Sequence, residues 1–281
     1  MVNPTGDVAV IGDTYRADGV VHVPGAFADW VEPLRAGVDT ALATPGVHTR
    51  RLSADDAPAP VTSDILRWRD ITPFERFVRA GGVAALAATV LDADAVVFLQ
   101  DQWFVKEAGA TTASPWHQDG PYYNVDGPMC TIWVALDDHP RDVSLELVRG
   151  SHRWGTRYGT REFVQAGAAP STVGASDDPA VPDIDADRDR YDIVGFDLAA
   201  GDAIVFDAGT LHGAPGNGHL DRPARRFSTR WTTPAARYGD TGPGAAAFWT
   251  QMGHGLVDGD PFTGEWFPTV TPDDADRARF R

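Results

Sequence analysis

The sequence is poor in cysteine and lysine, and it contains no long hydrophobic run. Its single cysteine, Cys130, stands in the apolar stretch "PMCTIWVAL", so an internal disulfide is excluded and a buried core position is expected. Each apolar run is shorter than the ~20 residues that a membrane helix needs, and the N-terminus has no basic segment followed by a long apolar one. We therefore expect a cytoplasmic protein without a membrane span.

Positive charge is also scarce. The chain carries 24 Lys and Arg residues against 40 Asp and Glu residues, which gives a formal net charge of −16, and Lys106 is its only lysine. A surface of this sign repels phosphate backbones and anionic lipids. We therefore expect a small-molecule substrate as the partner, rather than nucleic acid or a membrane. A monomer or a homodimer is expected.

Two kinds of local pattern follow one another along the chain. Residues 24–44 and 72–92 show helical periodicity, with apolar side chains on one stripe. Beyond them come short runs rich in Val, Ile, Phe, Trp and Thr, separated by Gly, Pro and Asp, which indicate an antiparallel sandwich or barrel. We expect one domain, with a helical flank at about 1–93, a β-rich core at about 94–235 and a C-terminal extension at 236–281.

An acidic segment at residues 171–192 interrupts the β-rich region. It is poor in large apolar residues, so burial cannot offset the entropy lost when it becomes ordered. Two interpretations stay open for it. It is either a solvated insertion or a lid over the mouth of the barrel.

Three side chains form a candidate metal site. His117 and Asp119 stand two apart in "SPWHQDGPYY", and alternate side chains of a strand point to one face. His212 ends the apolar run of "GDAIVFDAGTLHGAPGN" and supplies a third candidate ligand. His152, in "RGSHRW", competes with it for this role. Two histidines and one carboxylate, with three coordination positions left open, favour non-haem Fe(II).

Four segments taken in order resemble the phytanoyl-CoA dioxygenase-like family of Fe(II)/2-oxoglutarate oxygenases. They are "WHQDGPYY", "IWVALDD", "LVRGSHRW" and "GDAIVFDAGTLHGAPGN", and the similarity covers roughly residues 70–235. The resemblance implies a mainly β fold, namely a double-stranded β-helix (a cupin-like jelly roll) with flanking N-terminal α-helices. It also implies His117, Asp119 and His212 as iron ligands, with Fe(II), 2-oxoglutarate and O2 as the cofactor and cosubstrates.

The distal carboxylate of 2-oxoglutarate requires a buried cation, ideally an arginine. In "RRFSTRW", Arg226, Ser228 and Arg230 share one strand face, and we expect Arg226 and Ser228 to bind this carboxylate together. The family's usual arginine position falls on Ala224 here. Arg225 or Arg222 therefore stay open as alternatives if the strand bulges, and so does a solvated edge strand without a binding role.

Further cosubstrate contacts are implied by the resemblance. The family places a lysine near 2-oxoglutarate at the position of Lys106, in "FLQDQWFVKEAG", and Gln102 matches a position that lines the cosubstrate. Trp133 matches a tryptophan that packs against the cosubstrate, although core packing alone explains it equally. Tyr122 and Tyr123 either line the substrate pocket or pack beside it.

The sequence therefore predicts an Fe(II)/2-oxoglutarate-dependent oxygenase. We expect it to hydroxylate an unactivated C–H bond of a small, natural-product-like substrate of secondary metabolism, with release of succinate and CO2. One alternative is a cupin-like metal-dependent dioxygenase that does not use 2-oxoglutarate and needs no arginine for a keto acid. Another is a non-catalytic β-sandwich binding module, which would fold but show no iron-dependent turnover.

Overall fold

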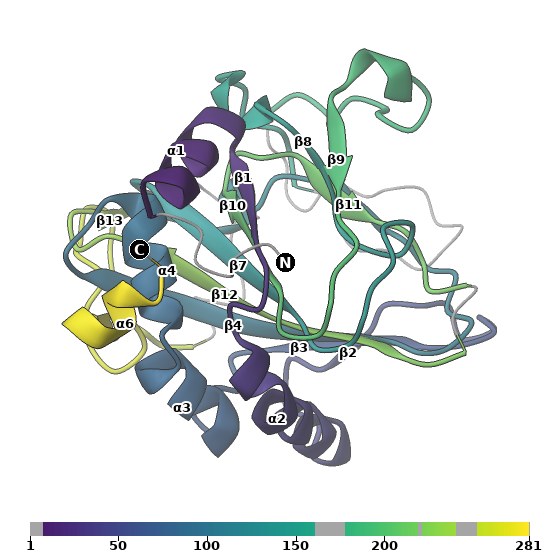
Figure 1. Ribbon diagram of the computed structural model, residues 1–281, viewed down its shortest axis with the longest axis horizontal. Helices are drawn as coiled ribbons and strands as arrows, with labels where there is room; N and C mark the ends of the chain where they lie inside the picture. Colours follow the sequence, from purple (N-terminus) through teal and green to yellow (C-terminus); the bar gives the residue numbers. More distant parts are fainter. Residues whose placement is uncertain (1–7, 161–177, 219–220, 240–251, 281) are drawn as a thin grey trace.

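Two antiparallel β-sheets face each other, and helices cover the outer face of the larger sheet (Figure 1). The computed structural model describes residues 8–160, 178–218, 221–239 and 252–280. This architecture confirms the expected mainly β, cupin-like jelly roll with flanking helices. Among the described residues, no helix combines the length and the apolar character that a membrane crossing requires.

The larger sheet has the order β1-β10-β7-β12-β4-β3-β2, and β14 pairs with β4. Its strands are β1 (Val20–Val23), β2 (Arg50–Arg51), β3 (Val61–Ile65), β4 (Val96–Lys106), β7 (Met129–Ala135), β10 (Ala203–Asp207), β12 (Ala224–Thr232) and β14 (Thr269–Val270). The smaller sheet has the order β5-β11-β8-β9. Its strands are β5 (Ser114–His117), β8 (Glu146–Val148), β9 (Ile193–Gly195) and β11 (His212–Ala214). A separate pair consists of β6 (Val125–Asp126) and β13 (Arg237–Tyr238).

The helices differ in detail from those that the periodicity of the sequence predicts. They are α1 (Val8–Asp18), α2 (Val31–Ala43), α3 (Thr72–Ala80), α4 (Val83–Leu91) and α6 (Asp274–Ala278). The expected helix over 72–92 is two helices, because the chain turns at the glycine pair 81–82, where Gly82 has a φ of 75°. Such a φ is in the left-handed region, which glycine adopts without a steric cost. The sequence patterns did not predict α1.

Strand alternation in β12 separates the helix-side core from the space between the sheets. Phe227 packs on the rings of Phe74 and Phe77 from α3, with centroids 4.4 and 5.8 Å apart. Its neighbours Arg226 and Ser228 therefore point to the opposite face, toward the smaller sheet. A helix that covers one face of the sheet thus fixes which β12 side chains face inward.

A β-bulge changes the alternation on the neighbouring strand β4. The register between β12 and β4 shifts between Arg230 and Trp231, which pair with Gln100 and Phe98. Phe98 consequently packs in the helix-side core, whereas Gln100, two residues further on, lines the cavity between the sheets. Bulges of this kind re-aim side chains next to functional sites.

The described part of the acidic segment 171–192 packs on the smaller sheet. Residues 171–177 lie outside the described residues. Val181 and Ile184 are buried in a cluster with Trp116 of β5 and Val148 of β8. This stretch therefore contributes apolar burial, which its acidic composition did not indicate.

Candidate metal centre and its cavity

The three predicted ligands meet at one point between the sheets. His117 ends β5 and His212 begins β11, and the two residues are direct partners in the antiparallel register, with ring centroids 4.1 Å apart. Asp119 follows β5 at the start of a short 3-10 turn with helical φ and ψ of −73° and −40°. One ligand atom from each of the three lies within 4.8 Å of the others, and all three side chains are buried. We call this set the triad.

Backbone carbonyls fix the orientation of both imidazole rings. The Nδ1 of His117 is 2.8 Å from the carbonyl oxygen of Pro115, and the Nδ1 of His212 is 2.9 Å from that of Thr210. A carbonyl only accepts, so each Nδ1 carries a proton and each Nε2 is turned toward the cavity. Burial, together with the neighbouring His117, lowers the pKa of His212 to about 3, which keeps this ring neutral at physiological pH. Imidazole rings oriented in this way are suited to bind a metal.

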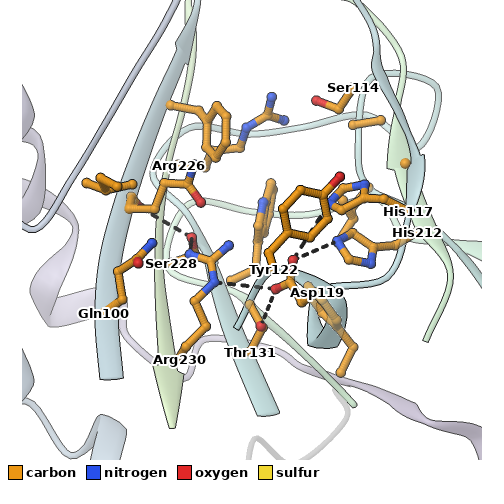
Figure 2. A pocket seen from close by; sticks show the side chains of 18 of the residues that line it. Gln100, Ser114, His117, Asp119, Tyr122, Thr131, His212, Arg226, Ser228 and Arg230 are labelled. Atoms are coloured by element: carbon orange, nitrogen blue, oxygen red, sulfur yellow. Dashed lines mark hydrogen bonds and ion pairs between the residues drawn. The ribbon is translucent and has the colours of Figure 1, made fainter. Parts of the chain in front are cut away.

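Asp119 faces the two imidazoles with one oxygen and the cavity wall with the other (Figure 2). Its Oδ1 is 3.6 Å from the Nε2 of His117 and 3.7 Å from the Nε2 of His212. Its Oδ2 accepts a 2.6 Å hydrogen bond from Thr131 and lies 3.4 Å from the Nε of Arg230. Burial raises the pKa of the Asp119 carboxyl, but the Arg230 guanidinium and the histidines outweigh it and hold this pKa well below its usual range.

These contacts make the triad suitable for a divalent transition metal. The separations between Oδ1 and the Nε2 atoms are too long for hydrogen bonds, and they leave room for one ion between an ionised carboxylate and two imidazole nitrogens. Two imidazoles and a carboxylate on one side of an ion leave the opposite positions open, as in non-haem Fe(II) oxygenases. His152, the competing candidate, lies elsewhere, with its Nε2 3.2 Å from the carbonyl oxygen of Arg16.

A cavity of about 200 Å³ opens from the triad between the two sheets. Four of the predicted cosubstrate residues line it, namely Gln102, Trp133, Arg226 and Ser228. Tyr122 and Tyr123 line it as well. The cavity therefore brings the expected metal site, cosubstrate residues and substrate residues together.

Arg226 lines this cavity, and no acidic side chain of the described residues forms an ion pair with it. Its side chain is 2% exposed, and its Nη1 has no hydrogen-bond partner among the described residues. Burial lowers the pKa of its guanidinium to about 10, so it stays charged at neutral pH. The guanidinium carbon lies 5.3 Å from the ring centroid of Phe104 and 5.8 Å from that of Trp133. A buried, charged donor of this kind is suited to bind a ligand carboxylate.

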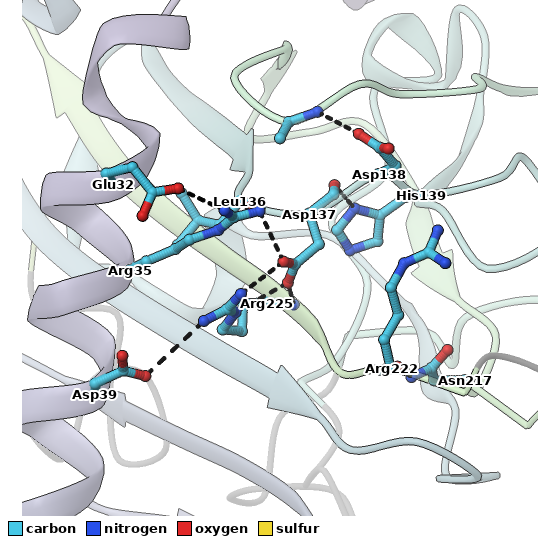
Figure 3. Close-up of polar contacts among 11 residues, drawn as sticks. Glu32, Arg35, Asp39, Leu136, Asp137, Asp138, His139, Asn217, Arg222 and Arg225 are labelled. Carbon is cyan, nitrogen blue, oxygen red and sulfur yellow. Dashed lines mark hydrogen bonds and ion pairs between the residues drawn. The ribbon is translucent and has the colours of Figure 1, made fainter.

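The alternative arginines have other surroundings (Figure 3). Arg225 points away from the cavity, and its Nε and Nη2 donate hydrogen bonds of 3.0 and 2.8 Å to the carboxylate of Asp137. Arg35 of α2 binds the same carboxylate at 3.0 Å. Arg222 is half exposed and lies 3.8 Å from Asp221. Of these arginines, Arg226 alone lines the cavity.

Lys106 and Ser228 are placed differently from the expectation. The buried ammonium of Lys106 donates to the carbonyl oxygens of Ala214 and Pro215, and Lys106 is not among the residues that line the cavity. Ser228 lines the cavity, but its hydroxyl donates to the carbonyl oxygen of Gln102 at 3.2 Å. The direct cosubstrate contacts expected of these two side chains stay predictions.

Arg230 and Thr131 contact Asp119, and the sequence analysis assigned a role to neither. Strand alternation placed Arg230 on the face of Arg226 and Ser228, but it gave no sign that Asp119 would be its partner. Thr131 stands inside the apolar strand β7, and a single threonine there carries no functional signal.

Comparisons with known proteins agree with this geometry. A family model described as phytanoyl-CoA dioxygenase (PhyH) matches residues 15–224. The ectoine dioxygenase of Stutzerimonas stutzeri (strain A1501) is 25% identical over 226 residues, which cover 74% of this chain and 72% of that protein.

Solved structures with the same fold include two proteins of nogalamycin biosynthesis. The epimerase SnoN, crystallised with Fe3+, alpha ketoglutarate and nogalamycin RO, has a TM-score of 0.73 and 23% identity and covers 93% of this chain and 98% of its own. The carbocyclase SnoK has a TM-score of 0.72 and 22% identity and covers 93% of this chain and 95% of its own. At these identities, the likenesses show a shared fold.

Proposed function

The chain belongs to the phytanoyl-CoA dioxygenase family of Fe(II)/2-oxoglutarate-dependent oxygenases, and from this premise we propose that it hydroxylates an unactivated C–H bond of a small organic substrate. The triad would hold the ferrous ion, through the Nε2 atoms of His117 and His212 and the Oδ1 of Asp119. Bound iron supplies the redox chemistry, in which R–H, 2-oxoglutarate and O2 yield R–OH, succinate and CO2. The observation that carries the proposal is one cavity that contains both this metal-ligand set and a buried arginine whose Nη1 has no hydrogen-bond partner in the described part of the chain.

Arg226 is the proposed anchor for the distal carboxylate of 2-oxoglutarate. The cosubstrate has a carboxylate at each end, so one end can reach the metal while the other takes a charge-assisted hydrogen bond from Nη1. The rings of Trp133 and Phe104 lie beside the guanidinium, within cation–π distance. SnoN, which has this fold, was crystallised with Fe3+ and alpha ketoglutarate.

A third protein ligand favours hydroxylation over halogenation. An iron held by His117, His212 and Asp119 would have a third protein ligand where a halogenating site needs room for a halide. Asp119 would therefore leave no position for a halide beside the cosubstrates. The protein's own contribution is to position the substrate C–H bond and to keep water out of the cavity.

The substrate would enter through a second cavity next to the first. This outer cavity of about 220 Å³ shares Ile65, Gln102 and Phe104 with the inner one, and His48 and Arg50 line its far part. A substrate larger than the keto acid can therefore lie across both cavities, with its reacting carbon near Tyr122. This favours a natural-product-like scaffold with polar substituents. The expected monomer or homodimer stays a prediction.

The test is a screen for 2-oxoglutarate turnover. The Fe(II)-loaded protein is incubated with 2-oxoglutarate, O2 and a panel of natural-product-like compounds, and succinate and oxidised products are measured. We expect at least one compound to raise succinate formation and to gain one oxygen atom, and the Asp119→Ala variant to form neither. Oxygenation without succinate would favour a dioxygenase that does not use 2-oxoglutarate. Binding without turnover would favour a non-catalytic module.

A further inference from the structure

A series of polar contacts leads from strand β4 to the Oδ2 atom of Asp119 (Figure 2). The Ser228 hydroxyl donates to the carbonyl oxygen of Gln102 at 3.2 Å and accepts a 3.1 Å hydrogen bond from the Nη1 of Arg230. The Nε of Arg230 lies 3.4 Å from the Oδ2 of Asp119, and Thr131 donates to the same oxygen at 2.6 Å. The reaction proposed above gives no role to this series of polar contacts.

We propose that Arg230 and Thr131 are positioning residues that hold Asp119 so that only Oδ1 faces the metal. The inference rests on the proposed function, because it takes Asp119 as a ligand. Oδ1 faces both imidazole Nε2 atoms, while Oδ2 is bound on the side of the cavity wall. A carboxylate without these partners can rotate and offer both oxygens to the ion. Its second oxygen would then occupy a position that the keto acid or O2 requires.

The two inward-facing arginines of β12 thus have separate tasks. Arg230 is buried, its Nε forms an ion pair with Asp119 without a well-aligned hydrogen bond, and its Nη1 donates to Ser228. Arg226, four residues earlier on the same face, has an Nη1 without a partner in the described residues. Arg230, which is paired with Asp119, orients the metal ligand. Arg226, whose Nη1 has no partner among the described residues, is left to bind the cosubstrate.

This assignment also changes the role expected of Ser228. Its proton is used by the Gln102 carbonyl and one of its lone pairs by Arg230, so in this arrangement it has no proton to offer a carboxylate. Ser228 supports Arg230 instead. Ser228 is therefore a further positioning residue, which acts on Asp119 through Arg230.

The test is metal binding by the full-length apoprotein, measured by titration with Co(II) and followed by the visible absorption of the bound ion. Arg230→Lys keeps the charge but loses the planar fork, and Thr131→Val keeps the shape but loses the hydroxyl. Both variants should weaken Co(II) binding about 10- to 100-fold and change the shape of the spectrum, as losses of partners behind a metal ligand do. Thr131→Ser should restore both properties.

The matched control is Arg226→Lys, which alters the same cavity without touching Asp119 and should leave the Co(II) affinity within about twofold of wild type. Asp119→Ala tests the underlying proposal, and it should lose most of the affinity. If Asp119→Ala loses Co(II) binding while Arg230→Lys and Thr131→Val bind it like wild type, the positioning role is wrong and the proposed function stands. Wild-type binding by Asp119→Ala would instead overturn the proposed function.

Ser228→Ala separates the two roles of the serine. We expect it to weaken Co(II) binding and to leave the affinity of the Co(II) protein for 2-oxoglutarate within about twofold of wild type. The reverse pattern, with unchanged metal binding and weaker 2-oxoglutarate binding, would place Ser228 in the keto-acid site and contradict the proposed series of contacts.

Discussion

Replacing Arg226 by methionine should weaken cosubstrate binding and at the same time stabilise the protein without ligand. The two effects have one cause. Arg226 is a buried cation whose Nη1 has no hydrogen-bond partner within the described residues, so it is costly in the free protein and becomes paired only when a carboxylate binds. Methionine has a similar length and no charge, so it removes both the cost and the binding group.

The magnitudes follow from the contacts of the guanidinium. Loss of one partner of a buried charge pair costs about 2–5 kcal/mol, which corresponds to a roughly 30- to 4,000-fold weaker affinity for 2-oxoglutarate. In the free protein, an unsatisfied buried donor costs about 1–3 kcal/mol. Each weak cation–π contact, here with Phe104 and Trp133, returns about 0.5–1 kcal/mol. We therefore expect a net gain of about 0.5 kcal/mol, or a Tm higher by about 1–2 °C.

The assay is thermal unfolding of the Co(II)-loaded protein with and without 2-oxoglutarate. Wild type should gain about 2.7 kcal/mol of stability at a hundredfold excess of ligand over its Kd. Arg226→Met at the same ligand concentration should gain almost nothing, although its ligand-free Tm is the higher of the two. An unchanged response to 2-oxoglutarate, or a ligand-free stability more than about 2 kcal/mol below wild type, would refute the reasoning.

Three further predictions concern the surroundings of the site. Arg225→Met should lower the free energy of unfolding by about 2–3 kcal/mol in a urea titration, because it leaves the buried Asp137 carboxylate with one arginine fewer, and it should not change 2-oxoglutarate affinity. Burial lowers the pKa of His139 from 6.5 to about 4. Wild type should therefore lose about 3 kcal/mol of stability between pH 6.5 and pH 4, because the unfolded chain takes up a proton that the folded protein does not. His139→Asn should lack this loss, and an equal loss in both proteins would contradict the role of His139. Ile65→Trp should fill the passage between the two cavities and raise the substrate KM at least tenfold, while 2-oxoglutarate still binds normally. A change confined to 2-oxoglutarate binding would show that the passage serves the cosubstrate.

Most of the candidate metal site could be predicted from the sequence. His117, Asp119 and His212 meet as expected, because short apolar strands carry both histidines to the same place between the sheets. The local cause is different from the expected one. β5 ends at His117, and Asp119 reaches the same point from a turn, not through strand alternation.

The choice among the arginines depended on contacts between residues far apart in the chain. Alternation within β12 predicted that Arg226 faces inward, and it does so. Nothing local to Arg225 indicates that its partner is Asp137, which is 88 residues away. Lys106 also faces inward from its strand, but its ammonium is taken up by the carbonyls of Ala214 and Pro215, which the fold brings there.

The helices illustrate the limits of periodicity. The apolar stripe over 72–92 is real, but two adjacent glycines divide it, since Gly82 adopts a left-handed conformation between α3 and α4. The bulge opposite Arg230 likewise has no sequence signal, although it decides that Gln100 faces the cavity and Phe98 the helices. The helix break thus has a local cause in the two glycines, whereas the bulge depends on the pairing of β4 with the distant strand β12.

The most direct test of the central claim is an anaerobic titration of the protein with Fe(II) and 2-oxoglutarate, followed by the visible charge-transfer absorption of a keto acid chelated to ferrous iron. We expect wild type to develop this absorption with one equivalent of each component. Asp119→Ala should fail to develop it, and Arg226→Met should develop it only at much higher 2-oxoglutarate concentration. Absence of the absorption in wild type, or its full retention in Asp119→Ala, would contradict the claim.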